Sequence, residues 1–158
     1  MNRPDGIHPA EPHDVPFIWN LIRELADFER LAHAVTGSEE GLRKSLFEEE
    51  GLYASVAVCA GSVIGYTIAF RTYSTFATAP GIWLEDIYVT PSHRGQGWGK
   101  RLLTHLAKQT ALRGWSRLDW AVLEWNQGAI EFYEGLGAKR LLDWQICRLE
   151  GAALDQFR

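Results

Sequence analysis

The sequence has little cysteine and no long apolar run, and each shortage excludes a class of protein. Two cysteines, Cys59 and Cys147, are too few for a disulfide framework, and their apolar surroundings predict buried thiols, not metal ligands. No apolar stretch approaches the roughly 20 residues of a membrane-spanning helix, and the acidic, Pro-rich residues 2–14 do not follow a signal-peptide pattern. A formal net charge of −4 argues against nucleic acid as the main partner. We therefore expect a cytoplasmic protein without a metal, a membrane or a nucleic acid as partner.

The composition is that of an ordinary globular domain. Apolar residues make up 46% and charged residues 23% of the chain. A length of 158 residues suits one domain but is short for two. The sequence also shows no internal repeat and no interdomain linker. We therefore predict a single domain over residues 1–158.

Hydrophobic periodicity and turn residues predict an α/β (α+β) chain with one mixed sheet. Strands are expected over residues 6–9, 53–60, 63–73, 82–89 and 117–123, with one or two more over 139–149. Helices are expected from the N-cap Asp14 to about Leu31, from Ser38, from the glycine loop to Arg113, and over 126–136. Hairpin-linked strands followed by two strand–helix units predict an antiparallel first part and a parallel pair around residues 90–100.

The most informative stretch is residues 84–100. A β-rich apolar run ends at Thr90, a loop containing Gly95, Gly97 and Gly99 follows, and a helical apolar pattern begins directly after it. Strand, glycine loop and helix form an arrangement that directs backbone N–H groups and the positive end of a helix at a phosphate. Glycine also lets the main chain approach the anion closely. The stretch predicts binding of a phosphorylated ligand.

The spacing excludes two common phosphate loops and fits a third. A P-loop would need Gly and Ser or Thr where the chain has Arg94 and Arg101, and the dinucleotide fingerprint would need Gly in place of Lys100. The pattern Arg/Gln-x-x-Gly-x-Gly/Ala does fit, on Arg94, Gly97 and Gly99. On these residues the chain resembles the GCN5-related N-acetyltransferase (GNAT) superfamily, whose loop holds the pyrophosphate of acetyl-coenzyme A.

Two adjacent carboxylates interrupt the strand that leads to this loop. Glu85 and Asp86 follow Ile82-Trp83-Leu84 and precede Ile87-Tyr88-Val89. Alternation along a strand predicts that the two side chains point to opposite faces, so at least one faces a covered side. A buried carboxylate needs a partner, or it lines a wet cleft with a raised pKa and does acid–base work. We favour the second alternative for Glu85, because it precedes a ligand-binding loop.

A second group of polar residues follows the strand at 117–123. Asn126 is placed to cap the next helix, and Tyr133 lies seven residues further on, two turns along the same face. Tyr133 is either core, like its neighbour Phe132, or an acid for a departing thiolate, since a phenol has a pKa near 10. The run Trp-Asn-x-x-Ala-Ile-x-Phe-Tyr-x-x-x-Gly-Ala, residues 125–138, is similar to the second GNAT motif.

Further blocks narrow the resemblance. Residues 21–29, 84–89 and 121–127 are similar to the diamine (spermidine/spermine) and thialysine N-acetyltransferases. The resemblance implies a single-domain GNAT fold with a splayed parallel pair of strands around the cofactor loop, and Glu85 as the base on the amine and Tyr133 as the acid to coenzyme A. It implies that Glu29, Glu85 and Asp86 hold the amine, although Glu29 also fits a solvated helix-surface acid. The cofactor residues that it implies are Ile87, Tyr88, Val89, Arg94, Gly95, Gln96, Gly97, Trp98, Gly99, Lys100, Asn126 and Tyr133.

Two functions remain open from the sequence. The first is transfer of an acetyl group from acetyl-CoA to a primary amine of a small cationic or zwitterionic acceptor, either a polyamine or a thialysine- or lysine-like amino acid. The second is a non-catalytic, coenzyme A-binding regulatory module on the same fold. The presence of both Glu85 and Tyr133 favours the enzyme, because a pure binding protein needs neither. The resemblance further implies a homodimer.

Overall fold

The computed structural model describes residues 3–158, which form two compact units. The first unit runs to Ala121 and the second from Val122 to Arg158. That residues 1–158 form a single domain stays a prediction.

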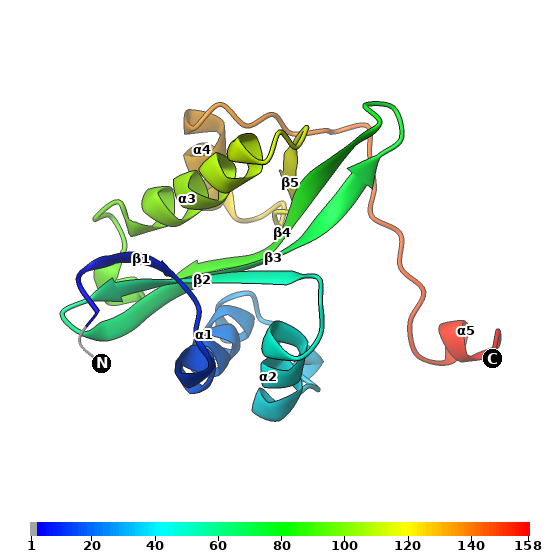
Figure 1. The fold of residues 1–158 in the computed structure, drawn as a ribbon. Coiled ribbons are helices and arrows are strands. Elements are labelled where there is room, and N and C mark those ends of the chain that lie inside the picture. The colour runs from blue at the N-terminus through cyan, green and yellow to red at the C-terminus, as the bar shows by residue number, and fades with distance from the viewer. Residues whose placement is uncertain (1–2) are drawn as a thin grey trace. The chain divides into compact units, whose positions relative to one another are not determined.

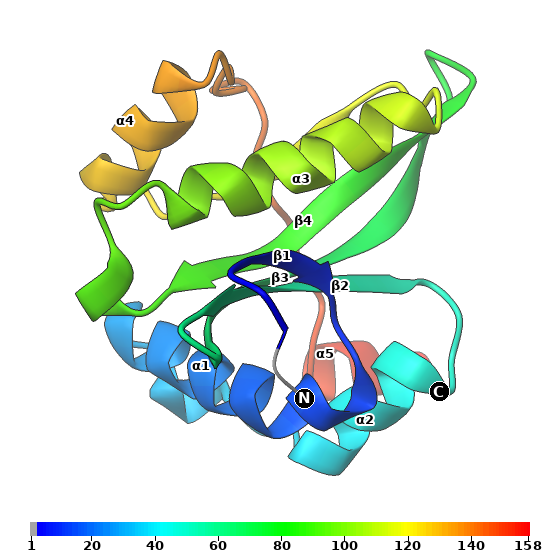
Figure 2. The same ribbon diagram turned by 60° about the vertical axis from the view of Figure 1, so that its left-hand side comes forward.

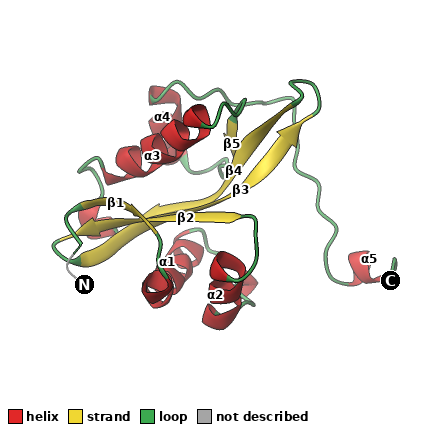
Figure 3. Ribbon diagram, viewed as in Figure 1, coloured by secondary structure: helices red, strands yellow, loops and turns green. Residues whose placement is uncertain are grey.

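The first unit contains a five-stranded sheet in the order of the sequence (Figures 1 and 3). Its strands are β1 (Gly6–Pro9), β2 (Leu52–Cys59), β3 (Ser62–Ser74), β4 (Ala79–Val89) and β5 (Leu118–Trp120). Neighbours from β1 to β4 are antiparallel, and β4 and β5 are parallel. The predicted mixed sheet with one parallel pair is therefore confirmed.

Helices cover both faces of this sheet (Figure 2). Helices α1 (Val15–Phe28) and α2 (Glu39–Phe47) lie on one face, and α3 (Trp98–Leu112) lies on the other. Apolar side chains at helical spacing on α1 and α3 pack against apolar strand residues, and they give one core on each face. The core beneath α1 contains Ile18, Leu21, Val56, Val58, Tyr66, Ile68 and Tyr88, and the core beneath α3 contains Ala57, Ile64, Val89, Trp98 and Leu102.

Short 3₁₀ turns precede or follow the helices. They are η1 (Pro12–Asp14), η2 (Ala32–Ala34) and η3 (Pro91–His93). The last of them connects β4 to the glycine loop. It therefore fixes where that loop leaves the sheet.

Helix α1 ends at Phe28, three residues before the predicted end near Leu31. Arg30 has a φ of 60°, in the left-handed region, and the N–H of Leu31 donates to the carbonyl oxygen of Ala26. This is the geometry with which many helices end, and it usually uses glycine. Here the residue is an arginine. Because the sequence has no glycine at this position to mark the end of the helix, the predicted helix is too long.

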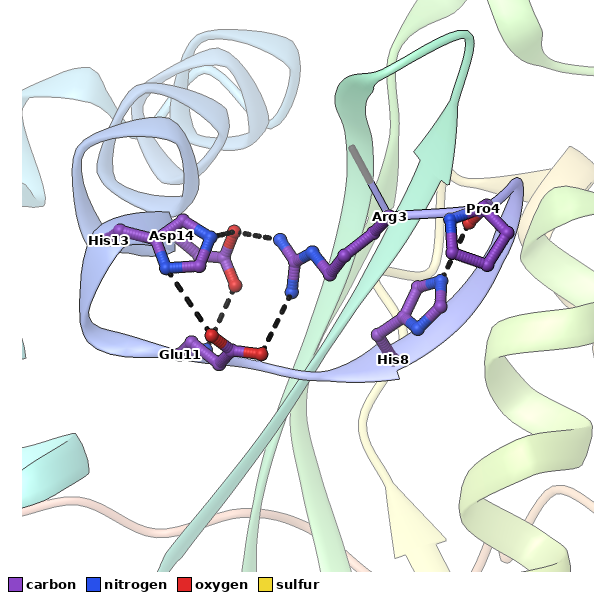
Figure 4. A network of polar contacts seen from close by, with 6 residues as sticks. All are labelled: Arg3, Pro4, His8, Glu11, His13 and Asp14. Carbon is purple, nitrogen blue, oxygen red and sulfur yellow. Dashed lines mark hydrogen bonds and ion pairs between the residues drawn. The ribbon is translucent and has the colours of Figure 1, made fainter. Parts of the chain in front are cut away.

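Asp14 precedes α1 as predicted, but its carboxylate does not cap that helix (Figure 4). The side chain is fully buried and accepts from the backbone N–H of Glu11 at 2.9 Å. It also pairs with the guanidinium of Arg3 and lies 3.6 Å from His13 Nε2. A buried carboxylate is stable only with such partners. The network joins the chain before β1 to the start of α1.

The parallel strand β5 is shorter than predicted, and β4 starts earlier. Thr78, at a φ of 48°, ends the turn after β3, and β4 begins at Ala79, three residues before the predicted start at residue 82. Strand β5 pairs only with Ile82 to Leu84. Strand β5 itself ends at Trp120.

The second unit contains α4 (Gln127–Gly135) and the short α5 (Ala152–Asp155). The strands predicted over residues 139–149 are wrong for this structure, since none of these residues belongs to a strand. Strand preference alone does not make a strand, because its backbone needs a neighbour to pair with. Cys147, predicted to be buried, is therefore exposed, and Cys59 is partly buried.

Candidate active site

A β-bulge in β4 places both adjacent carboxylates on one face of the sheet. Ile68 and Phe70 share a face of β3, and their partners on β4 are Asp86 and Trp83. Asp86 and Trp83 therefore share that face, although they are three positions apart and regular alternation would put them on opposite faces. Glu85 is the extra residue of the bulge, and its carboxylate accepts from the Trp83 indole N–H at 2.9 Å. The prediction that Glu85 and Asp86 point apart is wrong, because a bulge breaks the alternation on which it depended.

The fold raises the pKa of the Asp86 carboxyl. Its side chain is mostly buried on the α1 face, and it accepts a hydrogen bond from the Tyr66 hydroxyl at 3.2 Å. Burial raises the pKa of Asp86 to about 6, and the charges of Glu85 and Glu29 act in the same direction. The Tyr66 hydrogen bond opposes them. The sequence favoured Glu85 as the strand carboxyl with a raised pKa, whereas the raised pKa found here belongs to its neighbour Asp86.

Glu29 lies at the C-terminal end of α1, where its charge reaches Asp86 and Tyr66. Glu29 is partly buried, and this burial raises the pKa of its carboxyl. In the described residues 3–158, neither Glu29, Glu85 nor Asp86 forms an ion pair with a cationic side chain. Three close, uncompensated carboxylates favour a cationic ligand.

The edge of β4 that faces β5 is open beside this group. Strand β5 pairs with β4 only as far as Leu84, so among the described residues no strand pairs with that edge from Glu85 to Val89. An open strand edge offers N–H and C=O groups that can bind an extended, amide-containing molecule as they would another strand. The predicted pantetheine residues Ile87, Tyr88 and Val89 lie in this stretch.

The glycine loop has the backbone that phosphate binding requires. Gly95 and Gly97 have φ angles of 73° and 84°, in the left-handed region that glycine adopts without strain. Gly97 is the N-cap of α3, a helix of 15 residues, and no side chain caps it. The space where a side chain would stand at either glycine is open. The N-terminal N–H groups of α3 are thus free to meet an anion.

Arg94 turns from the loop toward α1. Its Nε donates to the carbonyl oxygen of Val89 at 2.9 Å. Its guanidinium lies 4.9 Å from the centre of the Phe28 ring and 5.2 Å from that of Tyr88. The side chain therefore links the loop to the end of β4 and to α1. Of the other loop side chains, Trp98 is core, Gln96 donates to the carbonyl of Ser92, and Lys100 is exposed.

The remaining predicted residues belong to the second unit. Asn126 caps α4 as predicted, since its side-chain oxygen accepts from the N–H of Ala129 at 3.3 Å. Tyr133 is partly buried, and its ring centre lies 5.2 Å from that of Phe132. Ile130 is the buried residue of this helix.

Two hollows in the first unit lie away from these residues. One, of about 300 Å³, is lined by side chains of α3 and β2, among them His105, Gln109 and Tyr53. The other, of about 340 Å³, lies beside α1 near Trp19 and Asp27. No predicted site residue lines either hollow.

Comparison with known proteins decides the family. The model of the Acetyltransferase (GNAT) family matches residues 18–138, which include the carboxylates, the open edge and the glycine loop. The chain belongs to this family. It is an N-acetyltransferase, and use of acetyl-CoA follows from the family.

Proteins of similar sequence or structure align with nearly the whole length of this chain. Mouse thialysine N-epsilon-acetyltransferase is 38% identical over 96% of this chain and 95% of its own length. L-Ornithine N5-acetyltransferase NATA1 of Arabidopsis thaliana is 32% identical over 94% of this chain and 85% of its own. The solved integron cassette protein VCH_CASS6 of V. cholerae is 25% identical, with a TM-score of 0.79 over 99% of this chain and 98% of its own.

Sequence reasoning did not single out Tyr66 as a neighbour of the candidate site. Its hydroxyl donates a hydrogen bond to Asp86 from the adjacent strand β3. The residue stands in an apolar strand after Gly65, where a tyrosine is typical of core. A register for the β3–β4 pair would have found it, but the bulge makes that register unreadable from the sequence.

In the described residues no helix is long and apolar enough to cross a membrane. The same part of the chain contains no group of three or more His, Cys, Asp or Glu side chains that could hold a metal ion.

Proposed function

We propose that this N-acetyltransferase transfers the acetyl group of acetyl-CoA to a primary amine of a small acceptor that carries a second cationic or zwitterionic end. The observation that carries the proposal is the group of Glu29, Glu85 and Asp86, three carboxylates without a cationic partner in the described residues, next to the open edge of β4. Two similar proteins are named for thialysine and ornithine, which are amino acids with a side-chain amine. Polyamines and lysine-like amino acids fit the same charges.

Acetyl-CoA suits the open edge and the glycine loop. The amides of pantetheine can pair with Ile87, Tyr88 and Val89 along β4, and the pyrophosphate can accept from the N–H groups of residues 95–100. Backbone N–H groups at the same edge would polarise the thioester carbonyl. Asn126 is proposed to complete the cofactor site.

The chemistry needs one base and one acid. An amine with a pKa near 10.4 is almost fully protonated at pH 7, so a proton must leave before the nitrogen attacks the thioester carbon. We assign this proton to Glu85, directly or through water. When the C–S bond breaks, the thiolate takes a proton, which we assign to Tyr133. The second proton, which the nitrogen loses as it becomes the amide, passes to water, and water returns a proton to the Tyr133 phenolate. Glu29 and Asp86 are proposed to hold the cationic end of the acceptor.

A thiol-release assay with a matched amine panel tests the proposal. Thialysine, ornithine, lysine and spermidine carry a second charged group, whereas butylamine has the same kind of amine without one. We expect release of free coenzyme A with members of the first set and little with butylamine or a neutral alcohol. Equal rates with butylamine would contradict the role of the carboxylates, and no release with any amine would contradict the proposed acceptor class.

We also propose a homodimer, formed through residues 141–149. Leu142, Trp144 and Ile146 alternate with polar residues and are 76%, 77% and 69% exposed, although the alternation is that of a half-buried strand. Exposed apolar segments of this kind are usually covered by another chain. A second copy of the chain is the partner that is always present.

Light scattering after size-exclusion chromatography tests the dimer. The wild type should have twice the mass of the chain, and Trp144→Ser with Ile146→Ser should reduce it to that of a monomer. Leu112→Ser, at an 82% exposed residue of α3, is the control and should leave the mass unchanged. A monomeric wild type would contradict this proposal. A cytoplasmic location is proposed as well, in keeping with two unpaired cysteines.

A further inference from the structure

Tyr66 is fully buried, and the one polar atom of its side chain, the hydroxyl oxygen, contacts a proposed substrate-binding residue. Its ring belongs to the core beneath α1, with 0% exposure. Its hydroxyl donates to Asp86 Oδ2 at 3.2 Å, across the β3–β4 pair. A buried hydroxyl in an apolar core costs free energy unless it is bonded. A phenylalanine would fill nearly the same space without that cost, so packing alone does not account for the hydroxyl.

Its cross-strand neighbour provides an internal comparison. Tyr88 is the partner of Tyr66 in the β3–β4 register, belongs to the same core, and donates to a carboxylate at the same distance of 3.2 Å. That carboxylate is Glu24, an exposed residue of α1. The two tyrosines hold different carboxylates, and Tyr88 also has the guanidinium of Arg94 over its ring.

We propose that Tyr66 is a positioning residue for the amine acceptor, which fixes the Asp86 carboxylate on the α1 face beside Glu29. The inference rests on the proposed function of Asp86. It adds a residue that touches neither the acceptor nor the cofactor but decides over which pH range the acceptor is bound.

The charges around Asp86 explain why it needs this donor. Burial raises the pKa of the Asp86 carboxyl most, and the like charges of Glu85 on β4 and Glu29 at the end of α1 add to the rise. The Tyr66 hydroxyl on β3 is the group that lowers it. Only the ionised carboxylate attracts a cationic amine, so the hydrogen bond keeps the binding form available near neutral pH.

Loss of the hydroxyl should move acceptor binding to higher pH. A hydrogen bond to a charged group is worth enough to change a pKa by about one unit. Starting from a pKa of about 6, Tyr66→Phe would titrate Asp86 about one unit higher. If only the ionised form binds, the KM for the amine should be about fivefold above wild type at pH 6 and equal to it at pH 8.5.

The experiment compares Tyr66→Phe with Tyr73→Phe, which removes the hydroxyl of an exposed tyrosine on the same strand. The KM and kcat for the best amine of the panel are measured from pH 5.5 to 9, together with acetyl-CoA binding. The Asp86 carboxyl is titrated by carbon-13 NMR without any substrate. We expect the KM of Tyr66→Phe for the amine to rise at low pH, with kcat at high pH and cofactor binding retained, and Tyr73→Phe to follow the wild type.

The outcomes separate this inference from the proposed function. An Asp86 titration unchanged by Tyr66→Phe overturns the inference even if the enzyme acetylates amines. A shifted titration in a protein that acetylates no amine supports the Tyr66–Asp86 contact and overturns the proposed function. If Tyr66→Phe does not fold, Asp86→Asn decides, because it should remove the pH dependence of KM over this range. A wild-type profile in Asp86→Asn would overturn the inference.

Discussion

Replacing Gly97 with valine should abolish the binding of acetyl-CoA, and the structure supplies a matched control for this change. Gly97 has a φ of 84° at the start of α3, and Gly114 has a φ of 67° just after that helix ends. At both positions the space around an added side chain is open. Both substitutions therefore carry the same backbone cost, at least about 1–2 kcal/mol for a side chain in the left-handed region.

The two positions differ in their proposed function, because Gly97 lies in the phosphate-binding loop and Gly114 does not. For a protein of this size, a loss of 1 kcal/mol lowers the melting temperature by about 2–4 °C. We expect a similar loss for Gly97→Val and Gly114→Val without ligand. At about 100 times its dissociation constant, acetyl-CoA adds about 2.7 kcal/mol to a protein that binds it. Gly114→Val should show this gain of several degrees, and Gly97→Val should not, because its loop no longer presents its N–H groups.

Thermal unfolding with and without acetyl-CoA, NAD and ATP measures both effects. The reasoning is refuted if Gly97→Val gains as much from acetyl-CoA as Gly114→Val does, because the loop would then not be the binding site. Equal stabilisation of the wild type by ATP would refute the motif assignment instead.

Three further predictions concern the residues proposed for chemistry. Tyr133→Phe should lower kcat by roughly 10²–10⁴ while the acetyl-CoA shift in melting temperature is kept, and an unchanged kcat would make Tyr133 a packing residue. In steady-state kinetics, Glu29→Gln should raise the KM for the amine with little change in kcat, whereas Glu85→Gln should lower kcat. If both variants had the KM and kcat of the wild type, the acceptor would bind elsewhere. Folding raises the pKa of Asp86 from an ordinary 3.8 to about 6. Ionisation of Asp86 therefore destabilises the folded state increasingly as the pH rises between those values. Asp86→Asn should for this reason raise the melting temperature relative to wild type more at pH 7.5 than at pH 4.

The sequence alone was sufficient for the elements whose causes are local. The glycine loop follows from Gly95 and Gly97, which adopt positive φ at little cost, and from the apolar periodicity of the helix behind it. The capping of α4 by Asn126 is equally local, since donor and acceptor are three residues apart. The order of strands and helices, and hence the mixed sheet, follows from such signals.

The tertiary structure decided what depends on pairing between distant segments. The bulge at Glu85 arises from the register between β3 and β4, and it alone brings Asp86 to Tyr66, twenty residues away in the chain. Likewise Arg94, which a motif assigns to the phosphate, lies against Phe28 of α1. Residues 139–149 show the converse case. Their alternation is a strand signal, but within residues 3–158 no segment pairs with them, and a strand without a partner leaves its backbone groups to water.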